Sequence, residues 1–247
     1  PLATPDTLGA ANGASFGAVL GILLGLPAFR AYRPFAMITG VCGRAHGLER
    51  GPVRGTIPPL MVILAGMVVS SLFSALVSLV KYAADPQDVL PSITYWLMGS
   101  MASTTRTTLI MGAPFILAGS LLLFLLRWKL NTMSLPEDEA KSLGIPVKRI
   151  RSLVILGAAM VTAAVVSMCG QIGWIGLLIP HMVRMIFGND NRSVVPASMA
   201  SGALFMLIID TAARSVMATE IPVSILTSLI GAPCFILLLR KTGGIRL

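Results

Sequence analysis

Residue types that could carry chemistry are few in this chain of 247 residues, and their spacing argues against catalysis. His46 and His181 lie far apart with no cluster of carboxylates near either, so a catalytic metal site is not expected. Cys42, Cys169 and Cys234 lack the spacing of a disulfide or metal motif, and we interpret them as small buried hydrophobic residues. The motifs G-x-x-x-x-G-K-[ST], H-E-x-x-H, C-x-x-C and G-x-S-x-G are absent. We therefore expect no enzymatic activity, no bound metal and no directly bound cofactor.

One stretch combines helix-breaking residues with ionisable ones. From Cys169 to Arg184 the chain reads Cys-Gly-Gln-Ile-Gly-Trp-Ile-Gly-Leu-Leu-Ile-Pro-His-Met-Val-Arg. Pro180 cannot donate the usual helical hydrogen bond, and small neighbours can satisfy the carbonyl that it frees. His181 and Arg184 leave two interpretations open, a proton relay or a pair that orders the end of the helix. We favour the second because Arg184 falls near the inner boundary of its predicted span.

The elements around this stretch are expected to cross a membrane. The sequence is 55% apolar and 12% charged, with a mean hydropathy of +0.84. Polar side chains are therefore too few to cover a soluble domain. Apolar runs of about 20 residues recur along the chain, which is the length that a helix needs to cross a hydrocarbon core about 30 Å thick. The composition predicts a multi-pass membrane protein.

The net charge of +9 reports topology rather than nucleic-acid binding. Fourteen of the 19 basic residues fall in alternate segments between the apolar runs, which is the bias typical of cytoplasmic loops. The fourteen are Arg44, Arg50, Arg54, Arg127, Lys129, Lys141, Lys148, Arg149, Arg151, Arg184, Arg192, Arg240, Lys241 and Arg246.

We treat residues 1–247 as one transmembrane domain. Its predicted spans are residues 14–29, 58–80, 107–126, 153–168, 172–187, 194–213 and 222–239. Residues 1–12 are predicted to form a loop that leads into the first span. Residues 34–42 are too short an apolar run to cross a bilayer as a helix, so we interpret them as a degenerate span, with a basic cytoplasmic loop as the alternative.

Two further segments complete the pattern, Asp210-Thr-Ala-Ala-Arg214 and Glu220-Ile-Pro-Val-Ser-Ile-Leu-Thr-Ser-Leu-Ile-Gly-Ala-Pro233. With the stretch from Cys169 to Arg184, they resemble the permease subunits of the iron-chelate (siderophore or haem) and cobalamin class of ABC importers. The resemblance covers nearly the whole chain. It implies an all-α, polytopic membrane protein with the transmembrane helical bundle of BtuC-like, type II ABC importers. Relative to that family, we expect the first two transmembrane helices to be missing, an N-terminal truncation.

The resemblance also implies a pathway helix. In the family, the span that matches residues 58–80 lines the central translocation pathway, and its cytoplasmic start lies at the inner gate. The residues that we carry over to the pathway and gate are Thr56, Pro59, Leu60, Gly66, Ser70, Ser71 and Ser74. Small and hydroxylic residues also mark close helix packing, so this alternative stays open for the glycine and the serines.

A capped helical arm is predicted at residues 134–151. Ser134 and Glu137 form a capping box, Pro136 falls in the first turn, and Gly144 supplies the end of the short helix. Pro146 then begins a helix that runs into the next span. In the family this loop docks into the ATPase subunit and transmits its motion, and a solvated connector is the alternative. The residues that we carry over to this coupling role are Pro136, Glu137, Ala140, Leu143, Gly144 and Pro146.

The resemblance implies partners. We expect the chain to pair with a copy of itself, to engage a cytoplasmic ABC ATPase that uses ATP, and to receive cargo from an extracytoplasmic solute-binding protein. Arg214 is the predicted docking residue for that binding protein, since an arginine at the matching position of the cobalamin importer meets a glutamate there. The expected location is the bacterial or archaeal cytoplasmic (inner) membrane.

The predicted function is that of a permease subunit of an ABC importer for iron-siderophore, haem or cobalamin-type chelates, with the pathway formed by a homodimer. Two alternatives remain. An integral membrane enzyme or electron carrier would need an intramembrane cluster of His, Asp, Glu or Cys, which the sequence does not show. A truncated, non-functional remnant of such a permease would also fit the short run at residues 34–42.

Overall fold

The computed structural model describes residues 10–25, 59–102, 104–132, 137–142, 144–216 and 220–241. Over these residues the ordered elements are all helices. They are α1 (Ala10–Leu23), α3 (Pro59–Ala83), α4 (Val89–Leu97), α5 (Arg106–Thr132), α6 (Glu137–Ser142), α7 (Val147–Cys169), α8 (Ile175–Phe187), α9 (Asn191–Ser215) and α10 (Val223–Lys241). The all-α prediction is confirmed.

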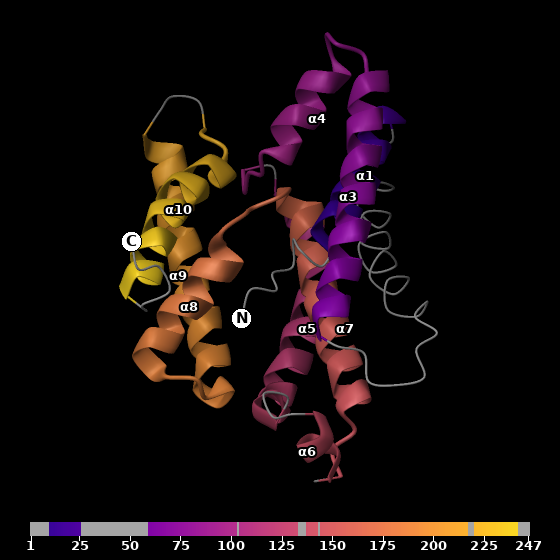
Figure 1. The fold of residues 1–247 in the computed structure, drawn as a ribbon. Helices are drawn as coiled ribbons and strands as arrows, with labels where there is room; N and C mark the ends of the chain where they lie inside the picture. The colour runs from indigo at the N-terminus through magenta and orange to yellow at the C-terminus, as the bar shows by residue number, and fades with distance from the viewer. Residues whose placement is uncertain are drawn as a thin grey trace.

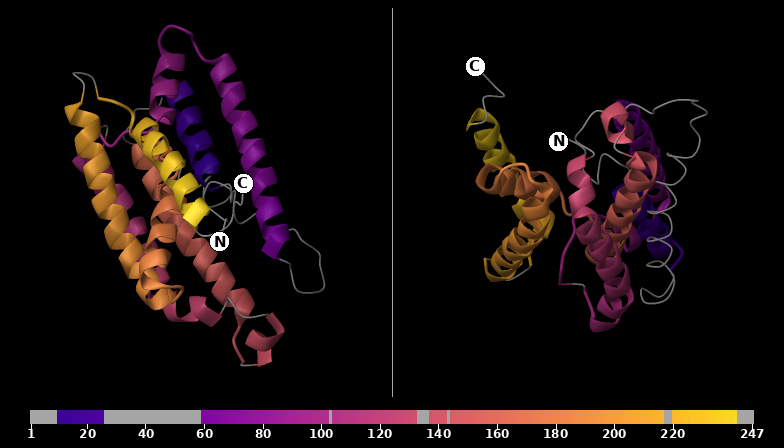
Figure 2. Two further views of the ribbon diagram at one scale, coloured as in Figure 1. Left: turned by 60° about the vertical axis from the view of Figure 1, so that its left-hand side comes forward. Right: turned by 90° about the horizontal axis from the view of Figure 1, so that it is seen from below.

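The long helices form two groups that lie side by side (Figures 1 and 2). In one group, α5 packs along α7, and α1 packs between α7 and α3. In the other, α8 and α10 pack against α9 and against each other. Contacts between α5 and α9 join the two groups. The short α6 lies at the lower end of α5 and α7 in Figure 1, and α4 lies at the upper end beside α1.

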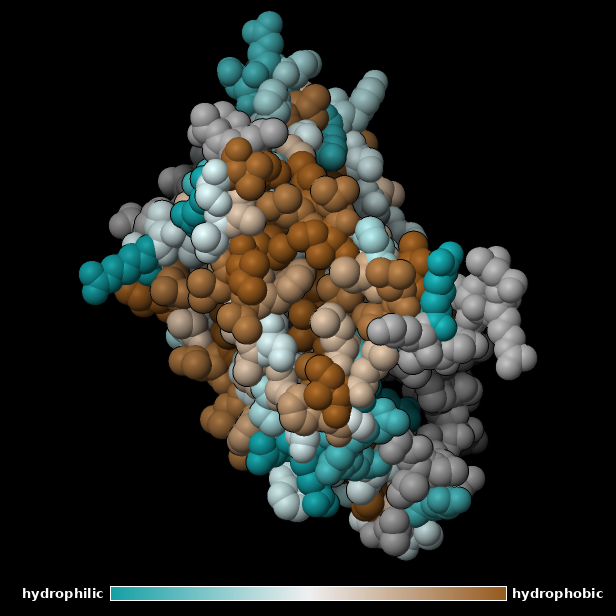
Figure 3. Space-filling model, turned by 90° about the vertical axis from the view of Figure 1, so that its left-hand side faces the viewer, coloured by the Kyte–Doolittle hydropathy of each residue, from teal (hydrophilic) through white to brown (hydrophobic). Residues whose placement is uncertain are grey.

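The surface is suited to lipid. Among the described residues, four helices are long and apolar enough to cross a membrane: α5, α9 and most of α3 and α7. The helices α1, α8 and α10 are shorter and apolar. On the side where α8, α9 and α10 lie, apolar side chains cover the middle of the molecule and hydrophilic ones gather towards its ends (Figure 3). Exposed residues in these helices include Leu207, Leu229 and Leu237, which are 69%, 70% and 60% exposed. The multi-pass prediction is confirmed.

The helices can be set beside the predicted spans. The spans 58–80, 107–126, 153–168, 172–187, 194–213 and 222–239 overlap α3, α5, α7, α8, α9 and α10. The span 14–29 overlaps α1, but α1 begins at Ala10, so the predicted loop at residues 1–12 is wrong for residues 10–12. The degenerate span at residues 34–42 lies outside the described residues.

Glycines let α5 and α7 approach closely. A Cβ added to Gly119 of α5 would lie 2.8 Å from the Gly157 carbonyl oxygen and 2.7 Å from Val161 Cγ2. Small residues at such interfaces replace side-chain bulk with close backbone contact, which is the usual mode of helix packing in membranes. The two helices are therefore tightly packed around the middle of α7.

Candidate functional site

The chain turns between α7 and α8 through a short connection, which we call the junction (residues 169–174). Gly170 ends α7 with φ +73°, and its N–H still donates to the Val166 carbonyl at 2.9 Å. Such a positive φ is accessible to glycine at little cost, whereas other residues resist it. The glycine therefore lets the chain leave the helix sharply and enter the space between the two helix groups (Figure 1).

The junction crosses the chain that follows α4 at backbone contact distance. A Cβ added to Gly170 would lie 2.3 Å from the Trp96 carbonyl oxygen, and one added to Gly99 would lie 2.4 Å from the Gln171 carbonyl oxygen. The Ser100 N–H donates to the Cys169 carbonyl at 2.8 Å. Two glycines thus allow two backbones to meet where no side chain would fit.

The start of α10 joins the same crossing. The Val223 N–H donates to the Gly99 carbonyl at 2.9 Å, and the Ser224 hydroxyl donates to the Met98 carbonyl. Backbone polar groups inside a membrane protein must be satisfied by the protein, and these two bonds do so for carbonyls just after α4. The ends of α4 and α7 and the beginning of α10 are therefore fixed together.

Trp174 closes the junction in an unusual backbone conformation. Its φ is +70°, the only positive φ of a residue other than glycine within the described ranges. Its carbonyl accepts from the N–H groups of Leu177 and Leu178 at 3.1 and 2.9 Å, so it starts α8. Its ring lies edge-on to Phe235 at 6.5 Å, and a Cβ added to Gly231 of α10 would lie 2.8 Å from Trp174 Cβ. Packing against α10 holds the strained residue in place.

A line of polar side chains runs from the junction to α3. Gln171 Nε2 donates to Asn12 Oδ1 of α1 at 2.7 Å. Asn12 Nδ2 in turn donates to the Ser70 hydroxyl of α3 and contacts the Ser70 carbonyl at 3.3 Å. All three side chains are partly buried. The junction is thus hydrogen-bonded, through α1, to the helix predicted to line the pathway.

The structure separates the roles of His181 and Arg184. Arg184 Nη2 donates to Asn191 Oδ1 at 2.9 Å, which ties the last turn of α8 to the first residue of α9. Of the pair predicted to order this helix end, the structure therefore places Arg184 alone in that contact. His181 instead lies edge-on to Phe235 of α10 at 5.9 Å, and its Nε2 is buried without a hydrogen-bond partner in the described part of the chain.

A second polar cluster lies where α5 ends and α9 begins, close to the last turn of α8. Asn131 of α5 donates to Asp190 Oδ1 at 2.6 Å and accepts from the Asn191 N–H at 2.8 Å. Asp190 also caps α9 by accepting from the Arg192 N–H at 2.9 Å. The bonds from Arg192 and Asn131 hold the pKa of Asp190 below its ordinary value of 3.8, because both donate to the ionised carboxylate. This cluster joins α5 to α9.

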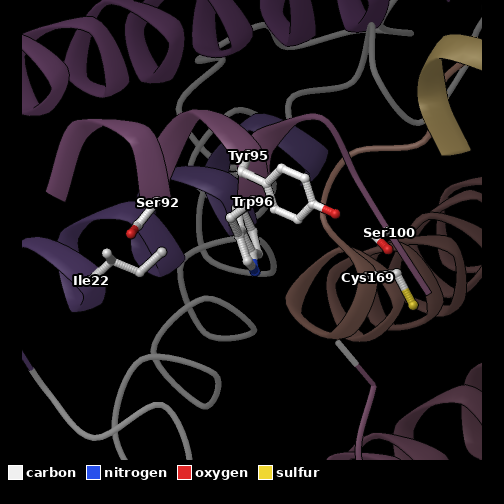
Figure 4. Close-up of a pocket in the computed structure, with 6 residues that line it drawn as sticks. All are labelled: Ile22, Ser92, Tyr95, Trp96, Ser100 and Cys169. Carbon is white, nitrogen blue, oxygen red and sulfur yellow. The ribbon is translucent and has the colours of Figure 1, made fainter. Parts of the chain in front are cut away.

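A cavity of about 290 Å³ lies beside the junction, between α1, α4 and the end of α7 (Figure 4). Its lining combines an aliphatic residue, the rings of a tyrosine and a tryptophan, two serine hydroxyls and a thiol. The lining residues are Ile22, Ser92, Tyr95, Trp96, Ser100 and Cys169. The serine hydroxyls are already engaged, since Ser92 donates to the Asp88 carbonyl at 2.9 Å and Ser100 accepts from the Ala102 N–H at 3.1 Å.

The predicted pathway residues differ in their exposure along α3. Ser71 and Ser74 are exposed, Gly66 is half-buried, and Ser70 is turned towards α1 by its bond to Asn12. Pro59 begins α3, and Leu60 follows it. Thr56 lies outside the described residues. The structure therefore does not bring all the carried-over residues to one surface.

The described coupling residues lie in and just after α6, which packs on α7 at one end of the molecule (Figure 1). Glu137 begins α6, Ala140 is 1% exposed, and the Ile145 N–H donates to the Ala140 carbonyl at 3.2 Å. Gly144 has φ +72°, as its predicted place after a short helix requires. Pro146 directly precedes α7, so the arm continues into a membrane-spanning helix without interruption. Pro136 and Leu143 lie outside the described residues, and so does Ser134 of the predicted capping box.

Arg214 lies at the end of α9 away from α6, and its side chain is 46% exposed. Its Nε donates to Asp210 Oδ2 at 2.9 Å, and its Nη1 lies 4.0 Å from Glu220 Oε1. An exposed pair of this kind contributes only about 0.3 to 0.5 kcal/mol to stability. Nη2 also donates to Asp210 Oδ1 at 3.2 Å, so the guanidinium is oriented by Asp210 while it stays accessible.

Comparison with known proteins agrees with this geometry. A model of the FecCD transport family matches residues 1–241. The chain belongs to the FecCD transport family. The chain is 41% identical to the molybdate import system permease protein MolB of Haemophilus influenzae, over 98% of this chain and 71% of that protein. It is 34% identical to an iron chelatin transport system permease protein of Helicobacter pylori, over 99% of this chain and 74% of that protein.

A solved structure shows the same fold as this FecCD permease. It is an inward-facing conformation of a metal-chelate type ABC transporter, with a TM-score of 0.89 and 40% identity, over 98% of this chain and 77% of that one. Membership of the family makes the chain a permease subunit of an ABC importer in the bacterial inner membrane, a transport component rather than an enzyme. Such a subunit works with an ATPase and a substrate-binding protein. The alternative of a membrane enzyme or electron carrier is set aside.

Sequence reasoning missed the polar residues that tie the FecCD fold together. Asn12 was placed in a loop, and Gln171, Asn131 and Asp190 were given no role. One signal could have found them: amide side chains next to long apolar runs are costly in lipid unless another helix satisfies them. Which helix does so depends on the fold, since the Gln171–Asn12 and Asn12–Ser70 pairs are 159 and 58 residues apart in sequence.

Proposed function

We propose that two copies of this permease enclose a translocation pathway between their α3 helices. The exposed side of α3 carries this proposal. Ser71, Ser74 and Ser78 are exposed at i, i+3 and i+7, so they share one face of the helix. Large apolar residues such as Val68 and Leu72, 70% and 60% exposed, lie beside them. A line of hydroxyls among exposed apolar residues is better suited to a second copy and a hydrated cargo than to lipid alone.

The arm (residues 134–151) is proposed to couple this pathway to the ATPase. In support, α6 packs on α7, and Gly144 and Pro146 join it directly to that helix. A displacement of α6 would therefore act on α7, which ends in the junction. ATP is proposed to be bound and hydrolysed by the partner alone, with no cofactor held by the permease.

The opposite end is proposed to receive the binding protein through Arg214. Its guanidinium is exposed beside two acidic residues, Asp210 and Glu220. A carboxylate on the binding protein could compete for such an accessible group, and exposed charges of this kind act mainly on the rate and specificity of docking. Since the similar solved structure is inward-facing, the conformation described here is proposed to be inward-facing as well.

Two cargo classes are proposed, and the comparisons favour them differently. Iron chelates, haem or cobalamin-type complexes follow from the family resemblance and from the relative named for iron chelatin, at 34% identity. Molybdate follows from the relative named for molybdate import, at 41% identity. The second is the sharper proposal because the identity is higher over the same share of the chain.

Uptake by a reconstituted complex tests the function. The permease is co-expressed with the ATPase and binding protein of its own genome, purified in detergent and placed in liposomes. ATP-dependent uptake is measured with radioactive molybdate, ferric citrate, haem and cobalamin in parallel. Saturable uptake of one cargo supports the corresponding class, and ATP hydrolysis by a stable complex without uptake of any of the four contradicts both.

Cross-linking tests the paired α3 helices. In a variant without native cysteines, Ser74→Cys should give dimers with a short thiol cross-linker. Leu121→Cys on α5, whose side chain is 58% exposed, is the matched control and should not. Cross-linking of the control alone would overturn the proposed arrangement.

Charge reversal tests the docking role of Arg214. Arg214→Glu should weaken binding of the solute-binding protein by about tenfold, because an attraction becomes a repulsion. Arg106→Glu is the control, since Arg106 is exposed at the start of α5 at the same end of the molecule. Equal losses in the two variants would show a general charge effect and contradict a specific contact.

A further inference from the structure

We infer that Asn12 is a positioning residue of the translocation pathway, which holds α3 to the junction through Ser70 on one side and Gln171 on the other. The inference rests on the proposed function, in which α3 lines the pathway. It concerns the side of α3 on which Ser70 meets α1.

The Asn12 amide uses both of its chemical functions in opposite directions. Its Nδ2 donates to the Ser70 hydroxyl and to the Ser70 carbonyl at 3.3 Å, while its Oδ1 accepts from Gln171 Nε2 at 2.7 Å. A carboxylate at this position would lose the donor that faces α3, and an apolar side chain would lose both bonds. An amide is therefore matched to the two partners that face it.

The bonds of Asn12 lie in the packed interface between α1 and α3. Residues beside Asn12 on α1 are buried, with Ala11 at 1% and Ala14 at 0% exposure, and α3 packs chiefly on α1. Aromatic and aliphatic contacts also join the two helices, such as Phe16 with Phe73 at 5.8 Å. Apolar contacts alone permit a helix to slide or rotate in the membrane, whereas a hydrogen bond fixes register and direction.

The far end of this link is anchored. Gln171 stands directly after Gly170, whose close contact with the Trp96 carbonyl leaves no room for displacement, and its own carbonyl lies against Gly99. The Cys169 carbonyl accepts a hydrogen bond from the Ser100 N–H at 2.8 Å. Asn12 therefore links α3 to the junction, which is held by these contacts and follows directly after α7.

A double-mutant comparison tests the inference. Asn12→Leu, Gln171→Leu and the double variant are made in the full complex with its ATPase and binding protein. Cargo transported per ATP hydrolysed is measured in liposomes, and the thermal midpoint of each complex is measured in parallel. Ser15→Ala is the matched control, because the Ser15 hydroxyl is buried on the same helix but donates only within it, to the Ala11 carbonyl at 2.9 Å.

Each single variant should lower the cargo transported per ATP by about three- to tenfold, the factor expected for loss of an interhelical hydrogen bond in a membrane. The double variant should be no worse than the lower single variant, because both substitutions break one link. Asn12→Gln, which keeps both functions on a longer side chain, should recover part of the loss, and the control should match the unaltered complex.

Three results would overturn the inference. They are an unchanged transport ratio in Asn12→Leu, losses that multiply in the double variant, and a lower thermal midpoint with a normal ratio in the surviving complexes. The last would make Asn12 a purely stabilising residue. Failure of the unaltered complex to transport any cargo would count against the proposed function, whereas normal transport by both the unaltered complex and Asn12→Leu counts against the inference alone.

Discussion

The junction and the arm are both built around a glycine with positive φ, yet they are constrained in opposite ways. At Gly170 in the junction, an added Cβ would lie 2.3 Å from the Trp96 carbonyl oxygen. The junction is also hydrogen-bonded to α1 and to the segment after α4, and Trp174 packs on α10. At Gly144 in the arm, an added Cβ would meet nothing within 4 Å. Gly170 is required both by its positive φ and by the backbone packed against it, whereas Gly144 is required by its positive φ alone.

This difference separates a fixed reference from a transmitting element. The junction connects helices of both groups, so its displacement would disturb several packed contacts at once. The arm packs on α7 and projects at one end of the molecule, so it can be pushed by a partner with little cost to the fold. A permease that changes state needs both kinds of segment, because a movable segment can shift one helix only relative to another segment that stays in place.

The most severe test of the comparison is a methyl group in the junction. Gly170→Ala should lower stability by roughly 2–6 kcal/mol, because the new Cβ meets the Trp96 carbonyl and the φ of +73° is strained for alanine. Gly173→Ala is the matched control, since nothing lies within 4 Å of its added Cβ. Recovery from membranes and the thermal midpoint in detergent measure the effect. Equal behaviour of the two variants would show that the junction is not rigid.

A smaller effect is expected where α10 supports the junction. Gly231→Ala places a Cβ 2.8 Å from Trp174 Cβ and should cost roughly 1–3 kcal/mol through overpacking. Gly202→Ala on α9 is the control, because its added Cβ meets Ile179 Cγ2 at an ordinary 3.9 Å. The thermal midpoint should fall for the first variant and stay level or rise for the second. A fall in both would assign the effect to α8 in general rather than to Trp174.

Substitution in the arm should affect coupling more than stability. Gly144→Val should cost only roughly 1–2 kcal/mol, the strain of a left-handed residue in open surroundings, while ATP-driven uptake falls. Gly144→Asn is the control, because asparagine tolerates this conformation and should keep most of the uptake. Thermal midpoint and uptake are measured on the same preparations. A loss of stability as large as that of Gly170→Ala would remove the distinction between the two regions.

The two regions also differ in how far the sequence predicted them. The arm follows local rules: Gly144 was predicted to end a short helix, and Pro146 to begin the helix that continues into the next span, and both are seen. These rules act over a few residues, so they can be applied without knowing the fold. The glycines of the junction were recognised as unusual, but their contacts with Trp96 and Gly99 depend on which distant segments meet there.

Asn12 shows why the remainder was missed. The predicted loop ran through residue 12, and asparagine is by itself a poor helix former that favours caps and turns. In the structure α1 begins at Ala10, because tertiary partners on α3 and in the junction satisfy the side chain within the helix. The helices themselves were predictable from apolar runs, whereas the bonds that relate one helix to another required the arrangement in space.

The smallest expected effect lies in the polar cluster that joins α5 to α9 near the arm. Hydrogen bonds from the Arg192 N–H and from Asn131 lower the pKa of Asp190 below 3.8, so the ionised carboxylate stabilises the folded state. For a lowered pKa, this contribution is complete above the unfolded value and is lost as the pH falls through the folded value. The thermal midpoint of Asp190→Asn should therefore differ from that of the unaltered protein by a constant amount between about pH 5 and 8. The difference should shrink only below 3.8. A difference that already shrinks near neutral pH would mean that the carboxylate is not held by these donors. The cluster would then be loosely constrained, as the arm is, and not fixed in place like the junction.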